Sequence, residues 1–240
     1  MRGNLKILAI ILGVLVLLAA AWPWFHPASS WRYRLVLEIE TPEGIKSGSS
    51  VRQVYVSEAS KLLVGKLVNT HVRGEAVAVD LGDRGVLFAL MNKGAQVDYG
   101  IYIVFEAFPW QHGIGNAFRP EARAYYSALL GKADLSFGKL PTLVRFRDIN
   151  DPKTVELVDP NDLAKSFGAG VRLKSASIEM VNKGYFPLSA LGLTGEPVTT
   201  RIEELVPWIE DSQKETEAWR SLIDQNVPVP SGTPDMMFRR

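Results

Sequence analysis

Residues 7–25 read ILAIILGVLVLLAAAWPWF, nineteen positions without a charged side chain. As an α-helix with a rise of about 1.5 Å per residue, this segment nearly crosses a hydrocarbon core of roughly 30 Å. Arg2 and Lys6 precede it, and Pro23 ends its helical pattern between two tryptophans, a residue type that favours the membrane interface. The segment therefore predicts a membrane anchor over residues 1–25, followed by a short linker at 26–30.

The predicted anchor has a single span. The positive charges of Arg2 and Lys6 favour a cytoplasmic N-terminus, which leaves everything after the linker exported. The alternative is a cleavable signal peptide, because Ala19, Ala20 and Ala21 fit the small-residue pattern before a cleavage site. Cleavage near Ala21 would give a secreted soluble protein. The apolar and interfacial residues of the anchor are Ile7, Leu8, Ile10, Ile11, Leu12, Val14, Leu15, Val16, Leu17, Leu18, Trp22 and Trp24.

The composition limits the classes of partner and of site. The 240 residues carry a formal net charge of +1, which gives no electrostatic argument for nucleic acid as a partner. The chain has no cysteine, and this excludes disulfides, thiolate metal sites and cysteine nucleophiles. The part after the anchor is long enough for one large or two small domains held by their apolar cores alone.

Residues 31–107 predict an antiparallel β module. Apolar and polar side chains alternate from Trp31 to Glu40, as in a half-buried strand. The runs 75–81 and 86–91 flank the glycine-bounded connection GDRG and predict a hairpin, with the second run buried on both faces. Alternation of Tyr99, Ile101, Ile103 and Phe105 predicts a further strand over residues 96–105.

Residues 108–226 predict an α+β region packed on that module. The proline-rich residues 227–240 predict a disordered tail. The fold class is therefore α+β and β-rich, with an N-terminal transmembrane helix before a mixed, mainly antiparallel exported domain. The elements expected after residue 107 are a helix from Pro120 to Leu130, strands at 143–147, 154–158 and 171–181, a short helix ending near Gly168, a helix capped by Thr200, and a helix opened by the capping box Ser212 to Glu215.

Four segments carry a resemblance to a known family. They are TPEG and GSSV within residues 41–51, GEAVAVDL at 74–81, FRD and DPKTVELVDP within 146–160, and PVTT with LVPW within 197–208. With these segments the chain resembles a family of uncharacterised proteobacterial membrane-associated proteins that have a single N-terminal span. The resemblance implies an origin in a bacterial envelope. Together with the predicted orientation of the anchor, this gives the inner membrane as the location, with the C-terminal domain in the periplasm. The resemblance implies no activity.

Two pairs of residues are candidates for catalysis. His112 lies in a glycine-flanked loop close to Glu106, and an imidazole beside a carboxylate can act in acid–base chemistry. Ser136 and Lys139 have the spacing of a Ser-x-x-Lys pair, although Gly138 between them weakens the helix that this pair needs. In each case a structural role is the more frequent explanation for such residues.

Two further features are considered for binding. Phe108, Trp110 and Phe118 cluster around one loop and can form an apolar contact patch, or can seal the junction between the β module and the next helix. Asp148 and Asp151 lie in an acidic turn, which is better explained by turn chemistry than by Ca²⁺. We predict no metal and no cofactor.

These observations lead to one main hypothesis and two alternatives. The main hypothesis is a membrane-anchored envelope protein that binds or scaffolds an envelope protein partner and contacts the lipid bilayer through its N-terminal helix. One alternative is an envelope hydrolase that uses the His112 loop. The other is the soluble protein that signal cleavage would release.

Overall fold

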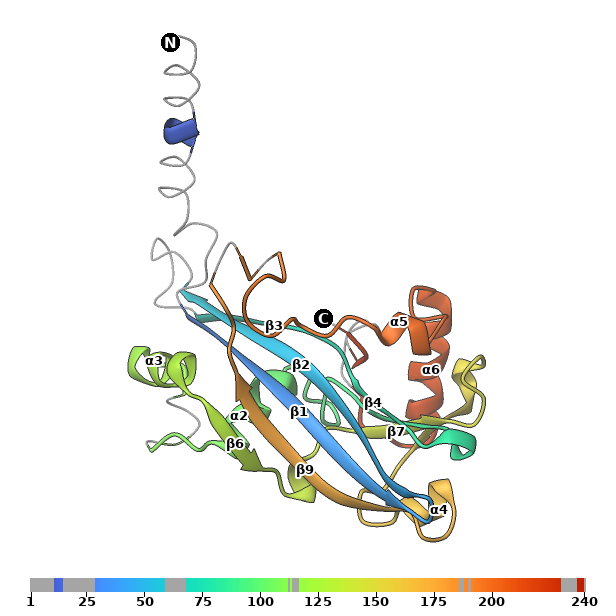
Figure 1. Ribbon diagram of the computed structural model, residues 1–240. Coiled ribbons are helices and arrows are strands. Elements are labelled where there is room, and N and C mark those ends of the chain that lie inside the picture. The colour runs from blue at the N-terminus through green and yellow to red at the C-terminus, as the bar shows by residue number, and fades with distance from the viewer. Residues whose placement is uncertain are drawn as a thin grey trace.

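The computed structural model describes residues 11–14, 29–58, 68–111, 113, 117–185, 188–189, 191–229 and 237–239. Its largest element is a five-stranded antiparallel sheet with the order β3-β2-β1-β9-β6 (Figure 1). In chain order these strands are β1 (Ser29–Thr41), β2 (Gly44–Glu58), β3 (Val68–Arg73), β6 (Gly131–Asp134) and β9 (Arg172–Val181). The alternation predicted from Trp31 is confirmed, because Trp31, Tyr33, Leu35, Leu37 and Ile39 are buried on the inner face.

A second antiparallel sheet forms the middle layer of the domain. Its order is β4-β5-β7-β8, from β4 (Val77–Asp80), β5 (Val86–Ala89), β7 (Leu143–Phe146) and β8 (Val155–Leu157). The predicted hairpin is confirmed as β4 and β5. Leu87 and Ala89 belong to the apolar core shared with the first sheet, whereas Phe88 and Leu90 belong to a second core on the opposite face. The second run of the hairpin is therefore buried on both faces, as its sequence predicts.

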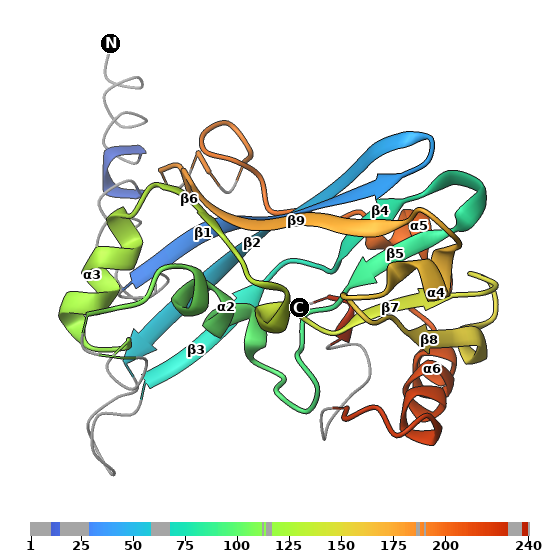
Figure 2. The ribbon, with the colours of Figure 1, turned by 90° about the horizontal axis from the view of Figure 1, so that it is seen from below.

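In the described part of the chain, five α-helices contribute to the two cores. The first core includes residues of α2 (Tyr99–Ala107), α3 (Pro120–Ala128) and α4 (Leu163–Phe167). The second core includes residues of α5 (Ile202–Leu205) and α6 (Ser212–Asp224). Figure 2 shows α6 beside β8, at the end of the domain remote from α3. The coarse fold class, α+β with mainly antiparallel sheets, agrees with the expectation from the sequence.

The predicted strand over residues 96–105 is wrong. This segment forms α2, in which Tyr99, Gly100, Ile101, Ile103, Val104 and Phe105 are all buried. A helix that is apolar on nearly every side fits a period of two as well as a period of 3.6, so alternation alone could not identify it. The segment 31–107 is therefore not a purely β module.

Two corrections concern the C-terminal part. The N-cap of α6 is Asp211, whose carboxylate accepts from the amides of Gln213 and Lys214, and not the predicted Ser212. The predicted disordered tail is wrong at residues 237–239, because Met237 and Phe238 are buried in the second core. Main-chain hydrogen bonds from Ala76 to Phe238 and from Met91 to Met237, both 2.7 Å, hold this end of the chain in place.

The predicted anchor lies almost entirely outside the described residues. Residues 11–14 form a helical turn in which Ile11, Leu12 and Val14 are exposed. Among the residues that the structure describes, none of the helices has the length and apolar character needed to span a bilayer. The other anchor residues, from Ile7 to Trp24, are not described.

Candidate functional site

In the structure, the described residues among those proposed for catalysis have partners other than the predicted ones. The ammonium of Lys139 lies 2.7 Å from the carboxylate of Glu106, so these two residues form an ion pair with each other. Ser136 is exposed and precedes a short 3₁₀ turn, in which its carbonyl accepts a hydrogen bond from the amide of Lys139 at 2.8 Å. The segment from Ser136 to Lys139 is thus a main-chain turn. His112 lies outside the described residues, and its pairing with Glu106 stays a prediction.

The residues around this ion pair also have structural roles. Tyr99 donates its hydroxyl to the carbonyl of Lys139, and Lys93 lies over the Tyr99 ring, 5.2 Å from its centroid. Burial raises the pKa of Tyr99, with the Glu106 charge as a second cause. Burial also lowers the pKa of Lys93, and the neighbouring Lys139 charge adds to this. These contacts hold the turn at 136–139 against α2.

The aromatic residues proposed for binding pack partly against the first core. Phe118 lies with its ring centroid 5.5 Å from that of Phe105, and the hydroxyl of Tyr126 donates to the carbonyl of Phe108 at 2.8 Å. Trp110 packs on Tyr125 with a centroid distance of 5.3 Å. This arrangement matches the role of sealing the junction before α3. The binding role of Phe108, Trp110 and Phe118 stays a prediction.

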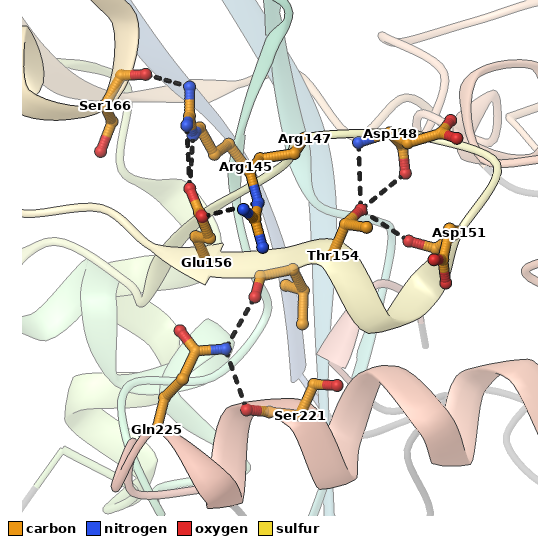
Figure 3. Close-up of polar contacts among 10 residues, drawn as sticks. Arg145, Arg147, Asp148, Asp151, Thr154, Glu156, Ser166, Ser221 and Gln225 are labelled. Carbon is orange, nitrogen blue, oxygen red and sulfur yellow. Dashed lines mark hydrogen bonds and ion pairs between the residues drawn. The ribbon is translucent and has the colours of Figure 1, made fainter.

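The acidic turn is held by internal hydrogen bonds, of which Figure 3 shows those between Thr154 and the main chain of Asp148 and Asp151. Asp148 accepts from the amide of Asn150 at 2.9 Å, and Asp151 accepts from the amide of Lys153 at 3.0 Å. The hydroxyl of Thr154 ties the turn together by donating to the carbonyls of Asp148 and Asp151. These are the turn contacts that Asp and Asn commonly make. In the described part of the chain no cluster of three or more metal-binding side chains occurs.

A groove of about 510 Å³ lies beside β2. Its walls are Ser49 and Val51 of β2 on one side and the segment 196–202 with Leu205 on the other. Ala76 and Ala78, next to and in β4, line it as well, and Arg34 of β1 closes one end. Somewhat more of the lining is apolar than polar.

One wall of the groove is fixed to the other by main-chain contacts. The amide of Val51 donates to Oγ1 of Thr199 at 2.8 Å, and the amide of Thr199 donates to the carbonyl of Val51 at 3.0 Å. The carboxylate of Glu75, which is buried, accepts from the amides of Arg201 and Ile202 at 2.6 and 2.9 Å. Glu75 therefore provides the hydrogen-bond acceptor at the start of α5. The predicted cap residue, Thr200, does not provide it.

The edge of β2 continues into this groove without a partner strand. Among the strands of the described chain, β3 covers only Gln53–Glu58 of this edge. Main-chain groups of alternate residues in an antiparallel strand face the same neighbour. Because Val51 faces Thr199, the amides and carbonyls of Ser49 and Ser47 face the same open side. Ser49 is itself part of the groove lining.

Three of the four charged residues in the groove lining, Arg34, Glu75 and Glu196, have protein partners. Arg34 bonds to Glu179 at 2.7 Å and also to Glu196. Beyond this end of the groove, Arg32 donates to Gln53 and to the carbonyl of Glu196, and burial lowers the pKa of its guanidinium.

Comparisons with protein-family models, with curated proteins and with solved structures found no match for this chain.

Sequence reasoning did not identify this groove as a site. Apart from four charged residues, its lining is small or apolar. It comes from four distant parts of the chain, none of which contains a catalytic or metal-binding pattern. Three of the segments that carry the family resemblance, at 41–51, 74–81 and 197–208, supply most of the lining. That these segments meet at one place is the signal that could have pointed to the groove.

Proposed function

We propose that this chain is a membrane-anchored envelope protein whose periplasmic domain binds an extended segment of a partner protein in the groove beside β2. The observation that carries the proposal is the open edge of β2 at Ser47 and Ser49, of which Ser49 lines the groove. An exposed edge of this kind pairs readily with an added strand. Thr199 already bonds to the next position, Val51, on the same edge.

The lining suits a polypeptide better than a small charged ligand. Arg34, Glu75 and Glu196, three of the four charged residues in the lining, already have protein partners, so few charged groups remain to recognise an ionic ligand. Leu205, Ile202 and Val198 provide apolar surface for alternate side chains of an added strand. The anchor is supported by the uncharged segment 7–25 and by the basic residues before it.

Two matched variants test the pairing mode. Ser49→Pro removes the amide that faces the groove, and proline is tolerated at an edge position of this kind. Ser49→Ala keeps the amide and is the control. A photoreactive residue at Leu205, which is partly exposed on the groove wall, should crosslink to one envelope protein in living cells. The adduct should persist with Ser49→Ala and be lost with Ser49→Pro.

The outcomes separate the parts of the proposal. An adduct that survives Ser49→Pro would show that the main-chain edge is not the binding element. An adduct pattern equal to that from the exposed Leu157, which lies on β8 away from the groove, would reject the groove as a binding site. The intact mass of the chain in the salt-washed membrane fraction tests the anchor, since cleavage near Ala21 would give a shorter soluble species.

A further inference from the structure

The loop after β9 exposes four large apolar side chains. Their exposed fractions are 78% for Tyr185, 44% for Leu188, 70% for Leu191 and 69% for Leu193. We call this segment, residues 182–185, 188–189 and 191–196, the β9 loop. A soluble surface rarely gathers so much apolar area on one short loop, because such area is more stable out of water.

Main-chain hydrogen bonds fix the shape of the β9 loop. At its base the amide of Glu196 donates to the carbonyl of Asn182 at 2.9 Å. Gly184 and Gly195 lie so close there that a β-carbon on Gly195 would be 2.3 Å from the Gly184 nitrogen. At its tip the amide of Leu193 donates to the carbonyl of Leu188 at 2.9 Å. The backbone thus has its own partners while the apolar side chains point outward.

The base of the loop is attached to the first residues of β1. The ammonium of Lys183 donates to the carbonyl of Ser30 at 2.8 Å, and Val181 at the end of β9 pairs with Arg32. Figure 1 shows the loop, in orange, at the end of the sheet where β1 begins. The loop and the start of the folded domain therefore lie at the same end of the molecule.

The sequence places that end close to the predicted bilayer. Ser29 follows the last anchor residue, Phe25, by four positions. Four residues span at most roughly 14 Å, at about 3.6 Å each when fully extended. If the anchor ends at the membrane surface, the start of β1 must lie within that reach, and the base of the β9 loop lies against it.

The charge of Lys183 at the base of the loop agrees with an anionic surface. Lys183 is partly exposed, and its ammonium donates to the carbonyl of Ser30, a neutral partner that leaves the positive charge in place near the loop. Anionic lipid headgroups attract such cations.

We propose that the β9 loop inserts its apolar side chains into the lipid bilayer beside the anchor and so fixes the orientation of the domain on the membrane. This inference rests on the proposed membrane anchor. The loop would contribute a second, interfacial contact of the kind in which apolar and aromatic residues enter the headgroup region. With one contact in the anchor and another in the loop, the domain could no longer rotate freely, and the β2 groove would keep a constant position relative to the membrane.

The absence of cysteine makes a direct test simple. Leu191→Cys and Leu193→Cys each take one polarity-sensitive fluorophore, as does the control Ile45→Cys, which replaces an exposed apolar residue at the β1–β2 turn. Each full-length variant is reconstituted in vesicles of phosphatidylethanolamine and phosphatidylglycerol with brominated acyl chains. We expect blue-shifted emission and severalfold stronger quenching for the two loop labels than for the Ile45 label.

The outcomes distinguish the loop from the anchor. If the protein sediments with the vesicles while the loop labels stay as unquenched as the Ile45 label, the loop does not contact lipid and the anchor proposal stands. Equal quenching at all three positions would also overturn the loop proposal, since contact would then not be specific to it. A protein that stays in the supernatant with unquenched labels would overturn both proposals.

Discussion

Thr199 and Val51 exchange two hydrogen bonds across the groove beside β2: the Val51 amide donates to the Thr199 hydroxyl at 2.8 Å, and the Thr199 amide donates to the Val51 carbonyl at 3.0 Å. Residues 148 positions apart are thereby joined as if a further strand began at this edge. The contact closes one end of the open edge and leaves Ser49 as the next free position.

The Thr199 hydroxyl should contribute measurably to this closure. Thr199→Val removes the acceptor of the Val51 amide, and a lost hydrogen bond of this kind costs about 1 kcal/mol. Urea unfolding of the full-length chain in detergent should show this loss, with faster hydrogen exchange at the Val51 amide. Thr200→Val is the control, because Thr200 is exposed. Equal effects of the two substitutions would contradict the assigned role.

The contact between the two sheets predicts a strict requirement for glycine at position 48. A β-carbon there would lie 2.1 Å from the carbonyl oxygen of Ala78, and both the oxygen and its carbon belong to the backbone of β4. Gly48→Ala must therefore push the sheets apart, and overpacking of this kind costs about 1–3 kcal/mol. Gly138→Ala is the matched control, with no atom within 4 Å of the added carbon.

The unfolding free energies of these two glycine variants check the prediction. We expect the midpoint of urea unfolding to fall clearly for Gly48→Ala and to stay near that of the unmodified chain for Gly138→Ala. An unchanged midpoint for Gly48→Ala would mean that β2 and β4 are farther apart than the structure has them.

The buried C-terminal segment should be essential for the second core. Phe238 lies with its ring centroid 6.1 Å from that of Phe88 and 6.0 Å from that of Phe146, and it is almost fully buried. Phe238→Ala should cost about 3–5 kcal/mol of unfolding free energy, as for other buried phenylalanines. Arg239→Ala removes only surface ion pairs with Glu203 and Glu210, and should cost less than about 1 kcal/mol. Similar losses for both variants would reject the docking of this segment.

The buried C-terminal segment shows which elements the sequence could predict and which it could not. Alternation and turn residues identified the long strands and the β4–β5 hairpin, because each of these elements has a local pattern. The segment at 237–239 has no periodicity of its own and is ordered by partners more than 140 positions away, at Ala76 and Met91. Non-local contacts of this kind leave no trace in a window of sequence, and the preceding prolines favour the opposite prediction.

The helix α2 and the groove were missed for different reasons. Tyr99 to Phe105 is apolar at nearly every position, so its pattern does not separate a helix from a strand. The groove lies where small residues such as Ser49 occupy an unpaired strand edge. The pairing of β2 with β1 and β3 decides which residues occupy that edge. The catalytic pairing of Ser136 with Lys139 was suggested by spacing alone, and Lys139 bonds to Glu106 instead.

The β1–β2 turn predicts a pH dependence on the acid side. Arg84 donates to both carboxylate oxygens of Glu43, at 2.8 and 3.3 Å, and this hydrogen bonding lowers the pKa of Glu43 from its usual 4.5 to about 2. A pKa that is lower in the folded state means that the contribution of this group to stability is complete above pH 4.5. That contribution is lost as the pH falls from 4.5 toward 2.

Arg84→Gln should therefore return the pKa of Glu43 to near 4.5 and remove its share of the acid-side change in stability. A carboxyl titration followed by NMR on the labelled full-length chain measures this directly. Lys46→Gln is the control, since it removes an exposed positive charge near the same turn without removing the Arg84 contact. It should leave the pKa of Glu43 close to 2. A value near 4.5 in the unmodified chain would show that solvent screens the pair and that Arg84 does not hold this carboxylate.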